Sequence, residues 1–153
     1  MKGTGFDRIE SIVKEISFFE DFNDNEIYFF SKQLSLRAVP KDTILFKEGE
    51  VGDYLFFIVE GSVEVRLAAT HAKSVIATYG FGQCVGEMSL LDDYARSATV
   101  EVIESSELLI LTKINMERIV KENPTIGVKI YKSLAKNLSI RLRGSSGRFS
   151  DLA

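Results

Sequence analysis

The sequence predicts an α+β fold in which a small antiparallel β-barrel or sandwich is flanked by helices at both ends of the chain. Apolar residues recur at helical spacing over residues 6–34 and again over 114–143. Between them, residues 36–113 consist of short runs rich in β-branched and aromatic residues, separated by turn signals. No helix of crossover length lies between these runs, and this argues against a parallel sheet.

Length and composition narrow the class of protein further. The chain has 153 residues, which fits one domain, and its formal net charge of 19 − 22 = −3 argues against a dedicated nucleic-acid-binding protein. A single Cys (Cys84) and a single His (His71) exclude a Cys-based zinc site and a His-rich metal centre. Cys84 is expected to be a small core residue, and His71 is expected to lie in an exposed polar loop. The sequence shows neither an apolar run long enough to span a membrane nor a signal peptide, so the expected location is the cytoplasm.

The first block contains two predicted helices joined by an aromatic segment. Asn23 and Glu26 have the spacing of a capping box, in which each side chain accepts from the other residue's backbone N–H. A helix is therefore expected to begin there. The apolar residues expected to face the core are Ile9, Ile12, Val13, Ile16, Ile27, Phe29, Phe30 and Leu34.

The middle block contains about seven predicted strands. Val63, Val65 and Leu67 alternate with polar residues, as in a strand that has one solvated face. A turn at residues 60–61 is expected to separate two of the strands. The predicted strands are residues 36–39, 43–46, 54–59, 62–67, 75–79, 97–102 and 108–111.

Two helices are expected after the strands. Thr112 is a cap for the first, and Asn123 followed by Pro124 begins the second, because Pro at the first helical position loses no hydrogen bond. Residues 144–153 are assigned to a flexible tail. A stripe of apolar residues expected to dock the last helix on the barrel consists of Ile126, Ile130, Leu134, Leu138 and Leu142.

Residues 82–100 carry the pattern most indicative of chemistry. Gly86 precedes a short helix-compatible run over residues 87–91, and the free N–H groups at the start of such a helix attract anions. Arg96 follows just before a strand, and its planar guanidinium can hold two phosphate oxygens. Glu87 is an acceptor suited to a sugar hydroxyl. The segment therefore predicts a pocket for a compact sugar phosphate with an apolar or aromatic remainder.

The run Gly86-Glu87-Met88-Ser89-Leu90-Leu91, followed after four residues by Arg96-Ser97-Ala98-Thr99-Val100, resembles the phosphate-binding cassette of cyclic nucleotide-binding domains. Residues 48–65 are similar to the strand–turn–strand signature of the same family, and the resemblance covers roughly residues 10–143. It implies a single domain over residues 1–143, with helices over 6–34, an eight-stranded antiparallel, jelly-roll-like β-roll over 36–113, and C-terminal helices over 114–143.

The resemblance also implies a role for each matching residue. Glu87 would accept a hydrogen bond from the ribose 2′-hydroxyl, and Arg96 would bind the cyclic phosphate. Ser97 would reach a phosphate oxygen or the base, and it leaves the choice between adenine and guanine open. Next to Gly86, backbone N–H groups of Met88, Ser89 and Ala98 would complete the phosphate cradle, and the sugar and base would be lined by Val65, Ile76, Ala77 and Val85.

The sequence departs from the family pattern at two positions near these residues. Ala95 stands where Pro is common before the Arg, and Phe81 replaces a small residue or Pro in the preceding turn. Neither change removes a ligand-contacting group. Arg141, Arg143 and Arg148 are expected to be solvated charges.

The resulting functional hypothesis is a non-enzymatic cyclic nucleotide sensor without a cofactor, which moves its C-terminal helix when cAMP or cGMP binds; cAMP is favoured. Its protein effector is unassigned, and a homodimer through the C-terminal helix is expected. Alternatives are a degenerate docking module without ligand, and the sensor half of a transcription regulator that lacks its DNA-binding domain. DNA and membrane binding by this chain are not expected, and a cupin-type metalloenzyme is disfavoured by the single His.

Overall fold

A computed structural model describes residues 5–67 and 74–152 of the chain, and His71 lies outside these residues. The N-terminal part consists of α1 (Gly5–Glu15), the short 3₁₀ helix η1 (Ser17–Phe19) and α2 (Asp24–Ser31). The predicted capping box at the start of α2 is confirmed, because Asn23 Oδ1 accepts from Glu26 N and Glu26 Oε1 accepts from Asn23 N, each at 2.9 Å.

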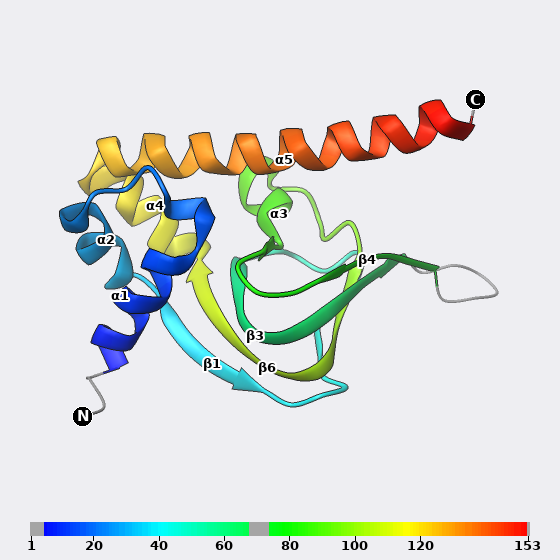
Figure 1. The fold of residues 1–153 in the computed structure, drawn as a ribbon, viewed down its shortest axis with the longest axis horizontal. Coiled ribbons are helices and arrows are strands. Elements are labelled where there is room, and N and C mark those ends of the chain that lie inside the picture. The colour runs from blue at the N-terminus through cyan, green and yellow to red at the C-terminus, as the bar shows by residue number, and fades with distance from the viewer. Residues whose placement is uncertain (1–4, 68–73, 153) are drawn as a thin grey trace.

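The sheet is antiparallel and rolled, as Figure 1 shows. Its central path runs β1-β6-β3-β4, with β2 paired to β6 and β5 paired to β3. The strands are β1 (Ser35–Val39), β2 (Ile44–Phe46), β3 (Tyr54–Leu67), β4 (Ser74–Tyr79), β5 (Cys84–Val85) and β6 (Thr99–Thr112). The α+β class and the antiparallel roll are therefore confirmed.

The expected count of eight strands is wrong, since the described residues form six. The predicted turn at residues 60–61 is instead an irregularity within one long strand, β3. Gly61 has φ +87°, so the backbone bends there, and the register with β6 shifts between Ile58 and Val63 while pairing continues. Because β3 and β6 each have 14 residues and bend, each takes the place of two shorter strands.

Two helices follow the sheet, α4 (Lys113–Glu122) and α5 (Pro124–Leu152). Both predicted caps are present, because Thr112 Oγ1 accepts from Asn115 N at 3.1 Å and Asn123 Oδ1 accepts from Ile126 N at 3.2 Å. Residues 144–153 are expected to form a flexible tail, and the described part of this segment, residues 144–152, continues α5 as a helix. No proline interrupts this stretch, and a helical Gly costs only about 1 kcal/mol relative to Ala.

The first half of β3 is buried on both of its faces, one against the helices and the other inside the roll. On β3, Leu55 and Phe57 belong to a core cluster shared with the helices, whereas Phe56 and Ile58 belong to a cluster inside the roll. Successive side chains of a strand point to opposite faces, which explains the division. Figure 1 shows α5 running along one side of the roll with α3 (Glu87–Asp92) between them. Among the described residues, no helix has the length and apolar character needed to span a bilayer.

Candidate ligand-binding site

A cavity of about 490 Å³ lies between the roll, α3 and the distal half of α5, here residues 138–152. This volume falls in the range of small-molecule sites. Apart from Ala77, all site residues predicted from the sequence line it: Val65, Ile76, Val85, Gly86, Glu87, Met88, Ser89, Arg96, Ser97 and Ala98. Ala77 is paired with Val65 across β3 and β4, and it packs against the cluster inside the roll.

Gly86 allows the chain to turn from β5 directly into α3. Its φ of +89° lies in the left-handed region, which strongly favours glycine. A Cβ atom at this position would also lie 2.8 Å from Arg96 Nη1 and 3.3 Å from the carbonyl oxygen of Tyr54. The turn brings the first residues of α3 to the cavity, where the N–H groups of a first helical turn have no intrahelical acceptors.

Arg96 is almost fully buried in the cavity wall, with 3% of its surface exposed. Its Nη1 donates to the Gly86 carbonyl at 2.8 Å and its Nη2 to the Tyr54 carbonyl at 2.6 Å, while Cζ lies 3.8 Å from the centroid of the Phe46 ring. Its Nε is buried and has no hydrogen-bond partner within the described residues. Burial lowers the pKa of Arg96, yet a guanidinium stays protonated near neutral pH. Since a guanidinium has five N–H donors, Arg96 retains the capacity to bind an anion.

The turn before β3 holds Arg96 in place. Gly49 N donates to the Arg96 carbonyl at 2.8 Å, and Arg96 N donates to the Glu50 carbonyl at 2.7 Å. A Cβ atom on Gly52 would lie 2.8 Å from Arg96 Nε and 2.3 Å from Ser89 Cβ. Glycine at this position therefore lets the turn approach Ser89 and Arg96 in the cavity wall, which gives a physical reason for Gly52 in the strand–turn–strand signature.

Glu87 is also buried, and its charge is compensated from α5. It forms an ion pair with Arg141, which also donates to the Cys84 carbonyl and places its Cζ 4.7 Å from the centroid of the Tyr79 ring. Burial raises the pKa of Glu87, and the guanidinium groups of Arg141 and Arg96 offset part of this effect. The carboxylate thus faces two cations inside a largely apolar cavity.

The expectation that Arg141 is a solvated charge is wrong, because only 28% of its side-chain surface is exposed and it lines the cavity. Helical spacing could have indicated this position. Arg141 follows Leu138 by three residues and the buried Leu134 by seven, so all three share one face of α5. Sequence reasoning also missed Phe46, Tyr79, Val100, Leu138 and Leu142 as lining residues.

The net charge and the apolar surface of the cavity lining indicate which ligand the cavity suits. Two guanidinium groups, Arg96 and Arg141, oppose the single carboxylate of Glu87, which leaves one net positive charge. Most of the remaining lining is apolar, with Val65, Val85, Val100, Leu138 and Leu142 among it. The arrangement suits a ligand with one negative charge, a hydroxyl donor and an apolar ring.

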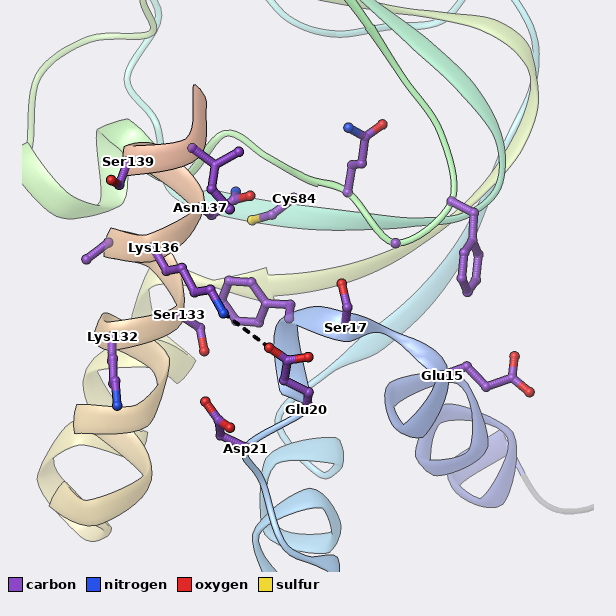
Figure 2. Close-up of a pocket in the computed structure, with 16 residues that line it drawn as sticks. Glu15, Ser17, Glu20, Asp21, Cys84, Lys132, Ser133, Lys136, Asn137 and Ser139 are labelled. Atoms are coloured by element: carbon purple, nitrogen blue, oxygen red, sulfur yellow. Dashed lines mark hydrogen bonds and ion pairs between the residues drawn. The ribbon is translucent and has the colours of Figure 1, made fainter. Parts of the chain in front are cut away.

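A second, larger cavity of about 900 Å³ lies on the other side of α5, against η1 and the turn before β5 (Figure 2). Its charged side chains are mixed, and Lys136 Nζ pairs with Glu20 Oε1 at 3.3 Å, as the dashed line in Figure 2 marks. Cys84, which reaches this wall, is buried in the core cluster, and burial raises the pKa of its thiol. None of the cavity's residues belongs to the predicted site.

Within the described residues, no three His, Cys, Asp or Glu side chains group as metal ligands would.

Comparison with known proteins identifies the fold and its sequence pattern. The family model described as the cyclic nucleotide-binding domain matches residues 36–123. The structure is similar to the crystal structure of a cyclic nucleotide-binding domain from Methylobacillus flagellatus, with a TM-score of 0.84 and 30% identity. The alignment covers 97% of this chain and 84% of that one.

Longer relatives contain a similar region. The chain is 33% identical over 128 residues to a cyclic nucleotide-gated potassium channel of Rhizobium etli, covering 84% of this chain and 35% of the channel. It is 32% identical over 105 residues to the cyclic AMP receptor protein of Thermus thermophilus, covering 67% of this chain and 48% of that protein. The chain thus spans between a third and a half of the length of these curated relatives.

Proposed function

Because this chain belongs to the cyclic nucleotide-binding domain family, we propose that it is a non-enzymatic sensor that binds cAMP or cGMP in the cavity beside Arg96. The observation that carries the proposal is the buried Arg96 guanidinium, which has unused donors and lies next to the first turn of α3 in an otherwise apolar cavity. Arg96 binds the cyclic phosphate there, together with the backbone N–H groups of Met88, Ser89 and Ala98.

The remaining lining residues contact the ribose and the base in this proposal. Glu87 accepts from the ribose 2′-hydroxyl, and Ser97 reaches the phosphate or the base. Val65, Ile76 and Val85 contact the sugar and base. The net positive charge of the cavity matches the single negative charge of a cyclic phosphodiester. We favour cAMP over cGMP, and Ser97 is compatible with either base.

The free energy of binding expected from these contacts is sufficient for micromolar affinity. Micromolar affinity needs about 8 kcal/mol. A hydrogen bond to a charged group contributes about 1.5–3 kcal/mol. The bonds from Arg96, from the α3 amides and to Glu87 therefore supply enough free energy after the ordering of ligand and side chains is subtracted.

We propose that α5 is the element that changes position when the ligand binds. Its proximal half is anchored by Ile126, Ile130 and Leu134, each with 1% of its surface exposed, whereas Leu138, Arg141 and Leu142 of the distal half line the cavity. A ligand that touches the distal half favours the position of α5 with which it interacts better. Coupling of this kind typically amounts to about 1–3 kcal/mol, and an effector that senses α5 would be regulated by it.

An exposed stripe on α5 supports a homodimer through this helix. Val128, Tyr131 and Leu142 are exposed, and with Ala135 and Leu138 they recur at alternating intervals of three and four residues. That spacing is the heptad pattern of helices that pair along their length. The second copy is the proposed occupant of this stripe.

Isothermal titration calorimetry with cAMP, cGMP and non-cyclic AMP tests the proposed function. At least one cyclic nucleotide is expected to bind in the micromolar range, and AMP much more weakly, because its phosphate carries more charge and is not held in the ring. If neither cyclic nucleotide binds up to about millimolar concentration, the chain is a docking module that has kept the fold without the ligand.

A further inference from the structure

We propose that Phe46 is a positioning residue that holds the Arg96 guanidinium, through the face of its aromatic ring, in the orientation that binds the ligand's phosphate. This role rests on the proposed function, since Arg96 is the side chain assigned there to the phosphate. It explains how a buried cation is kept in place without an acidic partner beside it.

Arg96 is buried without a direct counter-ion among the described residues. Only 3% of its surface is exposed, and it forms no ion pair with a carboxylate in the part of the chain that the structure describes. A buried charge is costly unless other groups compensate it. Two of its donors are used on the carbonyls of Gly86 and Tyr54, at 2.8 and 2.6 Å. Such bonds are made in the plane of the guanidinium, and its flat faces remain to be covered by other groups.

The Phe46 ring covers one of these faces. Arg96 Cζ lies 3.8 Å from the ring centroid, well inside the distance of about 6 Å over which a ring face attracts a cation. Phe46 is 7% exposed, so the attraction acts in a desolvated place, where it is strongest. The Tyr54 ring is farther away, with its centroid 5.2 Å from the same atom. Phe46 therefore compensates the buried cation as a carboxylate would, but leaves its full positive charge to an anion.

The fold fixes the ring as well as the cation. Phe46 is the last residue of β2 and packs in the cluster inside the roll. Its ring meets the Tyr54 ring edge to face, with the centroids 5.9 Å apart and the planes at 78°. The Tyr54 hydroxyl donates to the Leu45 carbonyl at 3.1 Å, and the Tyr54 carbonyl accepts from Arg96. The ring and the two carbonyls thus define a single orientation for Arg96.

This arrangement links the electron density of one ring to the affinity for the ligand. When the attraction of the ring for Arg96 is weakened, the guanidinium occupies other orientations for part of the time. The apparent affinity then falls with the fraction of molecules in which Arg96 is correctly oriented.

The test changes the electron density of the ring with little change in its shape. Phe46 is replaced by phenylalanine carrying one, two or three ring fluorines, which withdraw negative charge from the ring face, and by leucine, which has no ring. Calorimetry measures the affinity for the cyclic nucleotide that wild type binds. The affinity is expected to fall stepwise with each added fluorine, and Phe46→Leu is expected to weaken binding about 3- to 10-fold.

Phe56 is the matched control, because it is fully buried in the same cluster inside the roll but does not line the ligand cavity. Its fluorinated forms and Phe56→Leu are expected to bind within about twofold of wild type. Thermal unfolding of each variant shows whether it is folded.

Three outcomes would overturn this inference. Binding that is lowered in Phe46→Leu but unchanged by fluorine would mean that the ring only fills space. Binding that is strengthened by fluorine would mean that the ring face touches the phosphate itself. Unchanged binding in every Phe46 variant would mean that the two carbonyls orient Arg96 alone. A wild type that binds no cyclic nucleotide would overturn the proposed function, and this inference with it.

Discussion

Three charged residues determine the chemistry of the cavity, and each is held by a different part of the fold. Glu87 lies in the first turn of α3, Arg96 in the loop before β6, and Arg141 on α5. Arg96 is supported by two backbone carbonyls and by aromatic rings, and none of these groups carries a formal charge. Its positive charge is therefore available to an anion, while the charge of Arg141 is used on Glu87.

Arg96→Ala is expected to weaken binding of the cyclic nucleotide by about 3–5 kcal/mol, because a buried phosphate charge would lose its main partner. Calorimetry with wild type and variant measures the difference. Arg66→Ala is the control, since Arg66 pairs with Glu101 at 3.1 Å and does not line the cavity. Equal affinity of wild type and Arg96→Ala would show that the phosphate lies elsewhere.

At the scale of elements, the start of α2 is fastened to α5 through one carboxylate. Glu26 accepts from Asn23 N within the capping box and also pairs with Lys129 of α5. Burial alone would raise the pKa of Glu26, but the bonds from Lys129 and Asn23 outweigh it, and the pKa is lowered below 4.5. The ionised form of Glu26 is therefore the one that stabilises the packing of α2 on the proximal half of α5.

Glu26→Gln is expected to reduce the free energy of unfolding by roughly 1–3 kcal/mol near neutral pH. A carboxyl whose pKa is lowered on folding stabilises the protein above its unfolded pKa, and this stabilisation is lost as the pH falls through the lower, folded pKa. The difference between wild type and variant should thus shrink toward about pH 3. Urea unfolding across this range measures it.

Glu122→Gln at the exposed end of α4 is the control for that comparison, with an expected change within about 0.5 kcal/mol at neutral pH. A Glu26→Gln difference that grew on acidification would contradict the direction assigned to the pKa of Glu26. It would also mean that the ion pair with Lys129 does not stabilise the folded state.

At the scale of the whole molecule, α5 contributes to the core, to the ligand cavity and to the proposed dimer stripe. One face docks on the core through Ile126, Ile130 and Leu134, and the distal half closes the ligand cavity. Val128, Tyr131 and Leu142 of the heptad stripe are exposed, and Leu138 and Leu142 of the same stripe also line the cavity. With 29 residues, α5 is about 43 Å long, which provides room for a docked segment and a paired segment on one helix.

Val128→Glu is expected to convert the proposed homodimer into a monomer, because a charge on the stripe would be desolvated against the second helix. Sedimentation velocity at micromolar concentration distinguishes the two states. Ile140→Glu is the matched control, since Ile140 is 62% exposed on α5 but lies off the stripe. A wild type that sediments as a monomer would leave α5 without the proposed second copy.

Sequence reasoning succeeded where the deciding interactions are local. The capping box at Asn23 and the caps at Thr112 and Asn123 depend on residues three positions apart. The irregularity at Gly61 was interpreted as a turn, because a glycine with a positive φ suits both a turn and a bulge. Only pairing with β6 on both sides of Gly61 distinguishes the two.

The sequence by itself determined the class of fold, the helix starts and the local unit in which Gly86, Glu87 and Arg96 lie within eleven residues. Only the tertiary structure decided that Arg141 pairs with Glu87, 54 positions away, and that Gly52 must be small because Ser89 and Arg96 pack against it. Periodicity and capping chemistry act over a few residues, whereas the partner of a buried charge is whichever side chain the folded chain brings beside it.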